Sequence, residues 1–121
     1  MSFQSELEAI CAEVPGCRTA VVMSLDGISV ATHVQDAGDL DTEALLVELI
    51  GPLNQAIQVT QLVSAGSLST FEVSTSEVTL LIRVLSEEYI IALVLAPDAI
   101  PGQGRFAIRA HSAALRAELT Y

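Results

Sequence analysis

Residues 19–33 read TAVVMSLDGISVATH, and this stretch decides the fold. Its first half, Thr19–Leu25, is rich in β-branched and apolar residues, as expected of a buried strand. Ile28–His33 alternates between two faces, which is the period of a second strand. Between them lies Asp26-Gly27, the strongest two-residue signal for a tight turn. The sequence therefore predicts a β-hairpin that turns at Asp26-Gly27.

A helix is predicted before the hairpin. Apolar residues recur at helical spacing through Phe3–Val14, with acidic residues on the other faces. Ser2 or Ser5 can cap its N-terminus. Pro15-Gly16 ends the pattern, because proline cannot continue the helical hydrogen bonds and glycine accepts the left-handed cap.

A long helix is predicted after the hairpin. It starts at Asp41 or Thr42 and reaches about Ser64, and Gly66 is expected to close it. Gly51-Pro52 lies near its middle. The proline removes one backbone hydrogen bond there and should kink the helix.

Three more strands and a last helix complete the pattern. The strands are expected at Leu68–Ser74, Val78–Leu85 and Tyr89–Ala96, and their short polar connections indicate an antiparallel meander. Tyr89–Ala96 is apolar on both faces, which favours a central strand. Residues 102–104 lead into the last helix, Arg105–Leu119. The order α-β-β-α-β-β-β-α predicts an α+β fold in one domain, residues 1–121.

Charge and hydropathy narrow the classes of function. Of 121 residues, fifteen are acidic and five are basic, and the formal net charge is −10. Nucleic-acid binding needs basic side chains to neutralise phosphates, so this charge excludes it. No stretch is typical of a signal peptide or is long enough to span a bilayer. We therefore expect a cytoplasmic protein without nucleic-acid partners or membrane insertion.

Catalytic and metal-binding patterns are missing from the sequence. His33 and His111 lack metal-ligand spacing, and Cys11 and Cys17 are too far apart for a CxxC pair. No GxSxG elbow occurs, and without any lysine the chain has no Walker motif. The residues therefore predict neither catalytic residues nor a metal site nor a cofactor. They favour a protein that binds other proteins.

The long helix has one apolar face and one weakly charged face. A helical projection assigns to the core side Leu45, Leu46, Leu49, Ile50, Leu53, Ala56, Ile57 and Val63. It assigns to the opposite side Val47, Glu48, Gly51, Asn54, Gln55, Gln58 and Leu62. A solvent face in so acidic a protein should carry more than one charge, so we interpret it as an interface. Gly51 would let another helix approach closely.

The strand Leu68–Ser74 is a second candidate interface. It alternates, lacks proline and has a single charge, so as an edge strand it would be unprotected. Pairing with a second copy would cover it by a two-fold contact. The predicted dimer interface comprises Gly51, Leu62, Ser69, Phe71 and Val73.

The last helix offers an alternative docking surface. Arg105, Arg109 and Arg116 fall on one side of it, with Ser112 between them. Such a stripe could dock an acidic partner. It could also be an ordinary solvated face or pair with the chain's own acidic residues.

Two segments resemble the roadblock / dynein light chain family. They are Val14–Gly27, which reads VPGCRTAVVMSLDG, and Pro97–Leu119, with its glycines, arginines and alanine-rich helix. The element order is also similar over nearly the whole chain. The resemblance implies a five-stranded antiparallel sheet between helices. It also implies a homodimer in which the middle helices pack together and the third strands pair.

The resemblance is closest to bacterial MglB-like members and implies a function. Such proteins bind a small Ras-like GTPase through the paired middle helices and stimulate GTP hydrolysis without supplying a catalytic arginine. By position, the partner-binding residues would be Glu43, Val47, Glu48, Asn54, Gln55 and Gln58. The alternative is a structural adaptor, like a dynein light chain, that does not affect hydrolysis. A small-ligand sensor ranks last, because no convergent polar cluster is evident.

Overall fold

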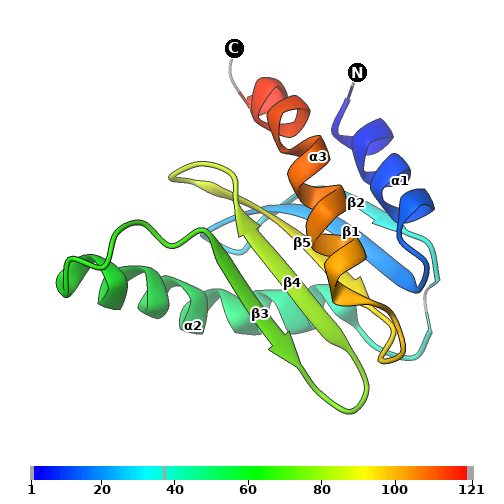
Figure 1. Cartoon of the computed structure of the whole chain (residues 1–121), viewed down its shortest axis with the longest axis horizontal. Helices are drawn as coiled ribbons and strands as arrows, with labels where there is room; N and C mark the ends of the chain where they lie inside the picture. The colour runs from blue at the N-terminus through cyan, green and yellow to red at the C-terminus, as the bar shows by residue number, and fades with distance from the viewer. Residues whose placement is uncertain (1, 37, 120–121) are drawn as a thin grey trace.

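Five antiparallel strands form one sheet whose two faces are covered by helices (Figure 1). The computed structural model describes residues 2–36 and 38–119. The predicted α+β order is confirmed. The elements are α1 (Phe3–Glu13), β1 (Cys17–Ser24), β2 (Ser29–Val34), α2 (Thr42–Leu62), β3 (Thr70–Ser74), β4 (Thr79–Val84), β5 (Tyr89–Leu95) and α3 (Pro101–Leu119).

The strand order across the sheet is β2-β1-β5-β4-β3. The strand that is apolar on both faces, β5, therefore lies at the centre, as predicted. Its neighbours are β1, with Ala20 opposite Leu93, and β4, with Leu81 opposite Leu93. The two edges are β2 and β3. This order decides which residues are available for contacts with other chains.

The core has two layers, one on each face of the sheet. Helices α1 and α3 lie side by side on one face, and α2 runs across the other (Figure 1). Leu7 and Ile108 belong to the first layer, which packs on Leu93 of the central strand. Leu46 and Leu53 belong to the second layer. Consequently the exposed sides of α2 and α3 face away from each other.

The hairpin is confirmed, but its loop has three residues, not the expected two. Gly27 has a positive φ of 88°, whereas Asp26 does not, so the mirror-image two-residue turn cannot form. Instead the Gly27 N–H donates to the Ser24 carbonyl at 3.0 Å, and the Ser24 N–H donates to the Ile28 carbonyl at 2.9 Å. This is the type I turn followed by a left-handed glycine.

The helix caps are partly as predicted. Ser2 caps α1 in a reciprocal pair with Ser5, and Asp41 caps α2 by accepting from the Ala44 N–H at 3.0 Å. The prediction that Gly66 closes α2 is wrong. Ser64 takes the left-handed position, with a φ of 59°.

The last helix begins at Pro101, four residues before the predicted start. Proline is favoured at a first helical position, because its missing N–H would have no partner there. Residues 102–104, expected as a lead-in, are therefore helical. Gly104 is buried against the sheet, and a Cβ there would lie 2.6 Å from Leu81 Cδ1. The close helix–sheet contact explains a glycine inside a helix.

The two cysteines meet inside the protein. Cys11 of α1 and Cys17 of β1 are both buried free thiols, with their Sγ atoms 2.9 Å apart. The hydrogen bond between the Cys17 and Cys11 thiols and the burial of Cys17 together raise the pKa of Cys17. The thiols join α1 to β1 as part of the core.

Candidate functional site

The C-terminal end of α2 extends past the edge of the sheet (Figure 1). A helix of 21 residues is about 31 Å long, whereas five strands side by side span only about 19 Å between the outer two. Three aliphatic side chains near its end are therefore exposed: Val59 by 53%, Leu62 by 84% and Val63 by 65%. The assignment of Val63 to the core is wrong, because the sheet ends before the helix does.

The neighbouring strand β3 has an open edge. It pairs with β4 alone, and the Val84 N–H donates to the Ser69 carbonyl at 3.0 Å. Because antiparallel hydrogen bonding alternates along a strand, the backbone groups of Thr70, Glu72 and Ser74 face away from β4. A second strand can bind to these groups.

Phe71 and Val73, on the open-edge strand, lie on the same side of the sheet as α2. Both side chains pack against the core layer that contains Leu46 and Leu53 and are only partly buried. We group these two residues with Ser69 and with the exposed aliphatic side chains at the end of α2, and we call the set the edge surface: Val59, Leu62, Val63, Ser69, Phe71 and Val73.

The single charge of β3 is neutralised from α3. Arg105 binds Glu72 through two hydrogen bonds, from Nε to Oε2 at 2.6 Å and from Nη2 to Oε1 at 2.9 Å. The hydrogen bond from Arg105 lowers the pKa of the Glu72 carboxyl. Two copies of β3 could thus lie side by side without bringing two uncompensated carboxylates together.

The residues predicted to bind a partner divide into two groups. Glu43, Val47 and Asn54 border the β1–β2 hairpin. The Glu43 carboxylate accepts from the Ser29 hydroxyl at 2.9 Å, and the Asn54 side-chain amide donates to the Leu25 carbonyl at 3.0 Å. Glu43 and Asn54 therefore help to hold the hairpin, and only Val47 and Glu43 remain exposed.

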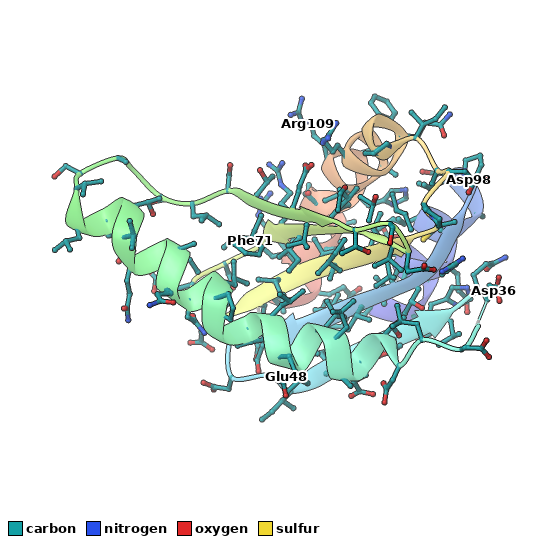
Figure 2. All side chains as sticks on the ribbon, turned by 90° about the horizontal axis from the view of Figure 1, so that it is seen from below. Asp36, Glu48, Phe71, Asp98 and Arg109 are labelled. Carbon is teal, nitrogen blue, oxygen red and sulfur yellow. The ribbon has the colours of Figure 1, made fainter. Side chains whose placement is uncertain are left out.

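The second group lies on what we call the outer face of α2: Glu48, Gly51, Gln55 and Gln58, all exposed. Figure 2 shows Glu48 pointing away from the sheet. This face carries one charge over more than two helical turns. Gly51 leaves open space beside the helix, with no atom near the position of a Cβ. The role of this face as a contact with another protein stays a prediction.

The predicted arginine stripe on α3 has its own partners inside the chain. Arg105 binds Glu72, and Arg116 Nε donates to the Leu85 carbonyl at 2.9 Å. Arg109 is exposed and has no hydrogen-bond or ion-pair partner among residues 2–36 and 38–119. The docking role of the stripe stays a prediction.

His111, on α3, joins this helix to two glutamates of α1. Its Nδ1 lies 3.0 Å from Oε1 of the buried Glu6, and its Nε2 lies 3.1 Å from Oε2 of Glu13. Partial burial lowers the pKa of His111, but the hydrogen bonds and charges of the two carboxylates raise it, and the raising effects prevail. The protonated ring can donate to both glutamates at once.

This contact predicts a pH-dependent stability. The pKa of His111 is higher in the folded protein than in the unfolded chain. Its contribution to the stability of the fold is therefore complete below the unfolded pKa, and it is lost as the pH rises through the folded pKa. The contact should therefore raise the free energy of unfolding by less than about 1 kcal/mol near pH 5, and this contribution should be absent near pH 8. Urea unfolding of wild type and His111→Gln at both pH values measures the difference. The matched variant His33→Gln should keep the wild-type difference; an equal loss in both variants would contradict the assignment.

The described part of the chain contains no group of three or more residues suited to hold a metal ion. Within the same residues, no helix is long and apolar enough to cross a membrane.

Known proteins resemble the chain in structure. MglC from Myxococcus xanthus is 32% identical, with a TM-score of 0.74, and the match covers 98% of this chain and 99% of MglC. A roadblock/LC7 domain from Streptomyces avermitilis reaches a TM-score of 0.82 at 16% identity, with 98% of both chains covered. An MglB in a tetrameric arrangement reaches 0.83 at 16% identity, covering 94% of this chain and 85% of that one.

Sequence comparison with models of protein families gives no match, and comparison with curated proteins gives none either. The structural matches nevertheless define the class: a five-stranded antiparallel sheet between helices, with an open third strand beside a long middle helix, is the roadblock fold. Because the chain is also 32% identical to MglC over almost the full length of MglC, the two proteins share common descent as well as a fold. The chain belongs to the roadblock/LC7 family.

Two parts of the candidate surface were not predicted from the sequence. Val59 and Val63 belong to the edge surface, and the helix length compared with the sheet width could have indicated this. Arg83 was not singled out, although it is the only charged residue of β4, and it lies near Arg105 and Arg109 in space. Only the packing of α3 against β4 brings it there.

Proposed function

We propose that the protein is a homodimer built on the edge surface. Pairing of two β3 strands would satisfy the backbone groups of Thr70, Glu72 and Ser74. The overhanging end of each α2 would then pass beneath the second copy, where Leu62 and its aliphatic neighbours find apolar cover. Such a contact is two-fold symmetric. The tetrameric arrangement of an MglB supports self-association in this fold.

We further propose that the dimer binds a small Ras-like GTPase and regulates it without catalytic residues of its own. The outer face of α2 is the observation that supports this proposal. It is exposed and almost uncharged, and the absence of a side chain at Gly51 leaves room for a partner to approach the helix closely. In the dimer two such faces would lie together and form a continuous surface. The family membership supports the same role, since the roadblock fold with MglB-like and MglC-like members suggests a regulator of small GTPases.

The test is nucleotide-dependent binding. A purified bacterial Ras-like GTPase, loaded with GDP or with a non-hydrolysable GTP analogue, is titrated with the protein by biolayer interferometry. Affinities should differ by about 10-fold or more between the two states, because a regulator must contact the segments that the nucleotide rearranges. Equal affinities for the two states would contradict the proposal.

A matched pair of charge reversals locates the contact. Glu48→Lys, on the outer face of α2, should weaken binding by about 10-fold. Glu8→Lys changes the net charge equally but lies on α1, across the sheet, and should leave binding within about 2-fold. Similar losses in both variants would show that only net charge matters.

A further inference from the structure

Three of the five arginines of this acidic chain line one pocket. The pocket, of about 210 Å³, lies between α3 and the β3–β4 edge, and Arg83, Arg105 and Arg109 contribute to its wall. Its single carboxylate is Glu72, which Arg105 already binds. The pocket therefore carries net positive charge on a protein whose net charge is −10.

Several hydrogen-bond donors of the arginine pocket have no acceptor among the described residues. The Nε of Arg83 is buried and has no partner within residues 2–36 and 38–119. A buried donor without an acceptor is costly, and its presence calls for a missing partner. Arg109 is exposed and also unpaired among these residues, and Arg105 uses only two of its five N–H groups on Glu72. The remaining donors are suited to a carboxylate.

Beside α3, on the side that faces α1, two large apolar side chains are exposed. Phe106, next to Arg105 in sequence, is 75% exposed, and Ile100 is 60% exposed. Between Phe106 and α1 runs a shallow groove of about 580 Å³, lined on α3 by small or uncharged residues such as Gly102 and Ala110. Its α1 wall is Glu13, whose carboxylate lies 3.1 Å from His111 Nε2. A large exposed aromatic beside a groove and free arginines is the composition of a binding hot spot.

We propose that this face of α3 binds an acidic amphipathic segment of a second protein partner, distinct from the GTPase. One carboxylate of the segment enters the arginine pocket, and its apolar side chains cover Phe106 and the groove. Charge complementarity favours this occupant: an acidic partner is repelled by most of the chain and attracted here, which sets its position. Figure 2 shows Arg109 and Glu48 on opposite sides of the sheet, so α3 stays open when α2 is occupied.

The experiment uses a designed peptide as probe. A fluorescent helical peptide carries leucines at positions i, i+3, i+4 and i+7 and glutamates along one border, and a twin peptide has glutamines instead. Fluorescence anisotropy with the full chain should give a Kd of about 100 µM or tighter for the acidic peptide. The glutamine twin should bind about 10-fold more weakly. Equal affinities for the two peptides would overturn the proposal.

Two variants and one matched control place the peptide. Arg109→Gln and Phe106→Ser should each weaken binding by about 5-fold or more. Arg18→Gln also removes one positive charge, at a half-buried position at the opposite end of the sheet, and it should change binding by less than about 2-fold. Equal losses for Arg18→Gln and Arg109→Gln would overturn the proposed site.

Two further measurements separate other occupants. Light scattering of Arg109→Gln and Phe106→Ser should give the wild-type mass. A reduced mass would assign this face to contacts between copies of the chain and overturn the proposal. A thermal shift with inorganic phosphate, lost in Arg109→Gln and accompanied by no peptide binding, would assign the pocket to a free small anion and also overturn it.

Discussion

Replacing Leu62 with glutamate should convert a dimer into folded monomers. Leu62 is 84% exposed in the single chain, so the substitution removes almost no packing from the monomer. In the dimer each leucine would be buried, and burial of a leucine contributes about 1.5–3 kcal/mol, twice over by symmetry. Placing two carboxylates in that apolar contact adds a desolvation cost. Light scattering measures the mass at micromolar concentration.

Ala44→Glu is the matched control. It adds the same charge to an exposed position of the same helix, but at the end that the sheet covers. It should leave the dimer mass unchanged. Circular dichroism should show wild-type helix content for both variants. A monomeric wild type, or a Leu62→Glu variant that stays dimeric, would remove the edge surface as the dimer contact.

Gly51→Glu extends this test along α2. Gly51 has open space around it within one chain, so a glutamate there should not disturb the monomer. Dissociation of the Gly51→Glu variant would place the helix–helix contact at the middle of α2. A dimer split by Leu62→Glu alone would confine the contact to the overhanging end and leave Gly51 to the GTPase.

Gly16→Ala should produce the largest loss of folding stability, about 2–4 kcal/mol. Gly16 has a φ of 86°, which costs an alanine about 1–2 kcal/mol. A Cβ would also lie 2.8 Å from Ala99 Cβ, and this short side chain cannot turn away. The Gly16 carbonyl accepts from the Ala96 N–H at 2.8 Å, so a backbone shift would break the link between β1 and the end of β5.

Urea unfolding of Gly16→Ala and Gly66→Ala separates the two causes. Gly66 has a similar φ of 92° but no atom near its Cβ position, so Gly66→Ala should lose only the backbone strain, about 1–2 kcal/mol. The difference between the variants measures the contact with Ala99. Equal losses would show that the contact relaxes without cost.

Much of the fold can be predicted from local chemistry. The hairpin, the Ser2 cap, the Asp41 cap and the central position of Tyr89–Leu95 depend on residues close in sequence or on strand hydropathy. The predictions fail where two nearby residues could serve the same structural role and the surrounding structure decides between them. Glycine at position 66 is the better left-handed residue, yet Ser64 takes that role because the last helical hydrogen bond is donated by Val63, the residue just before it.

The candidate site is predictable only in part. The outer face of α2 and the strand containing Phe71 could be identified, because their weak charge is visible in the sequence. The exposure of Val63 does not follow from helical periodicity, which says nothing about where the sheet ends; it follows only when the helix length is compared with the sheet width. The arginine stripe was drawn along one helix, whereas the structure gathers Arg105 and Arg109 with Arg83 from a strand and leaves Arg116 elsewhere.

The sequence by itself determined the α+β class and the order of elements, because periodicity and turn chemistry are properties of neighbouring residues. It also determined the absence of familiar catalytic and nucleic-acid-binding patterns, because these depend on local motifs and on net charge. Only the tertiary structure decided which strands are edges, how far α2 extends past them and which arginines meet. These follow from the order β2-β1-β5-β4-β3, a set of long-range pairings in which a residue's exposure depends on strands distant in sequence.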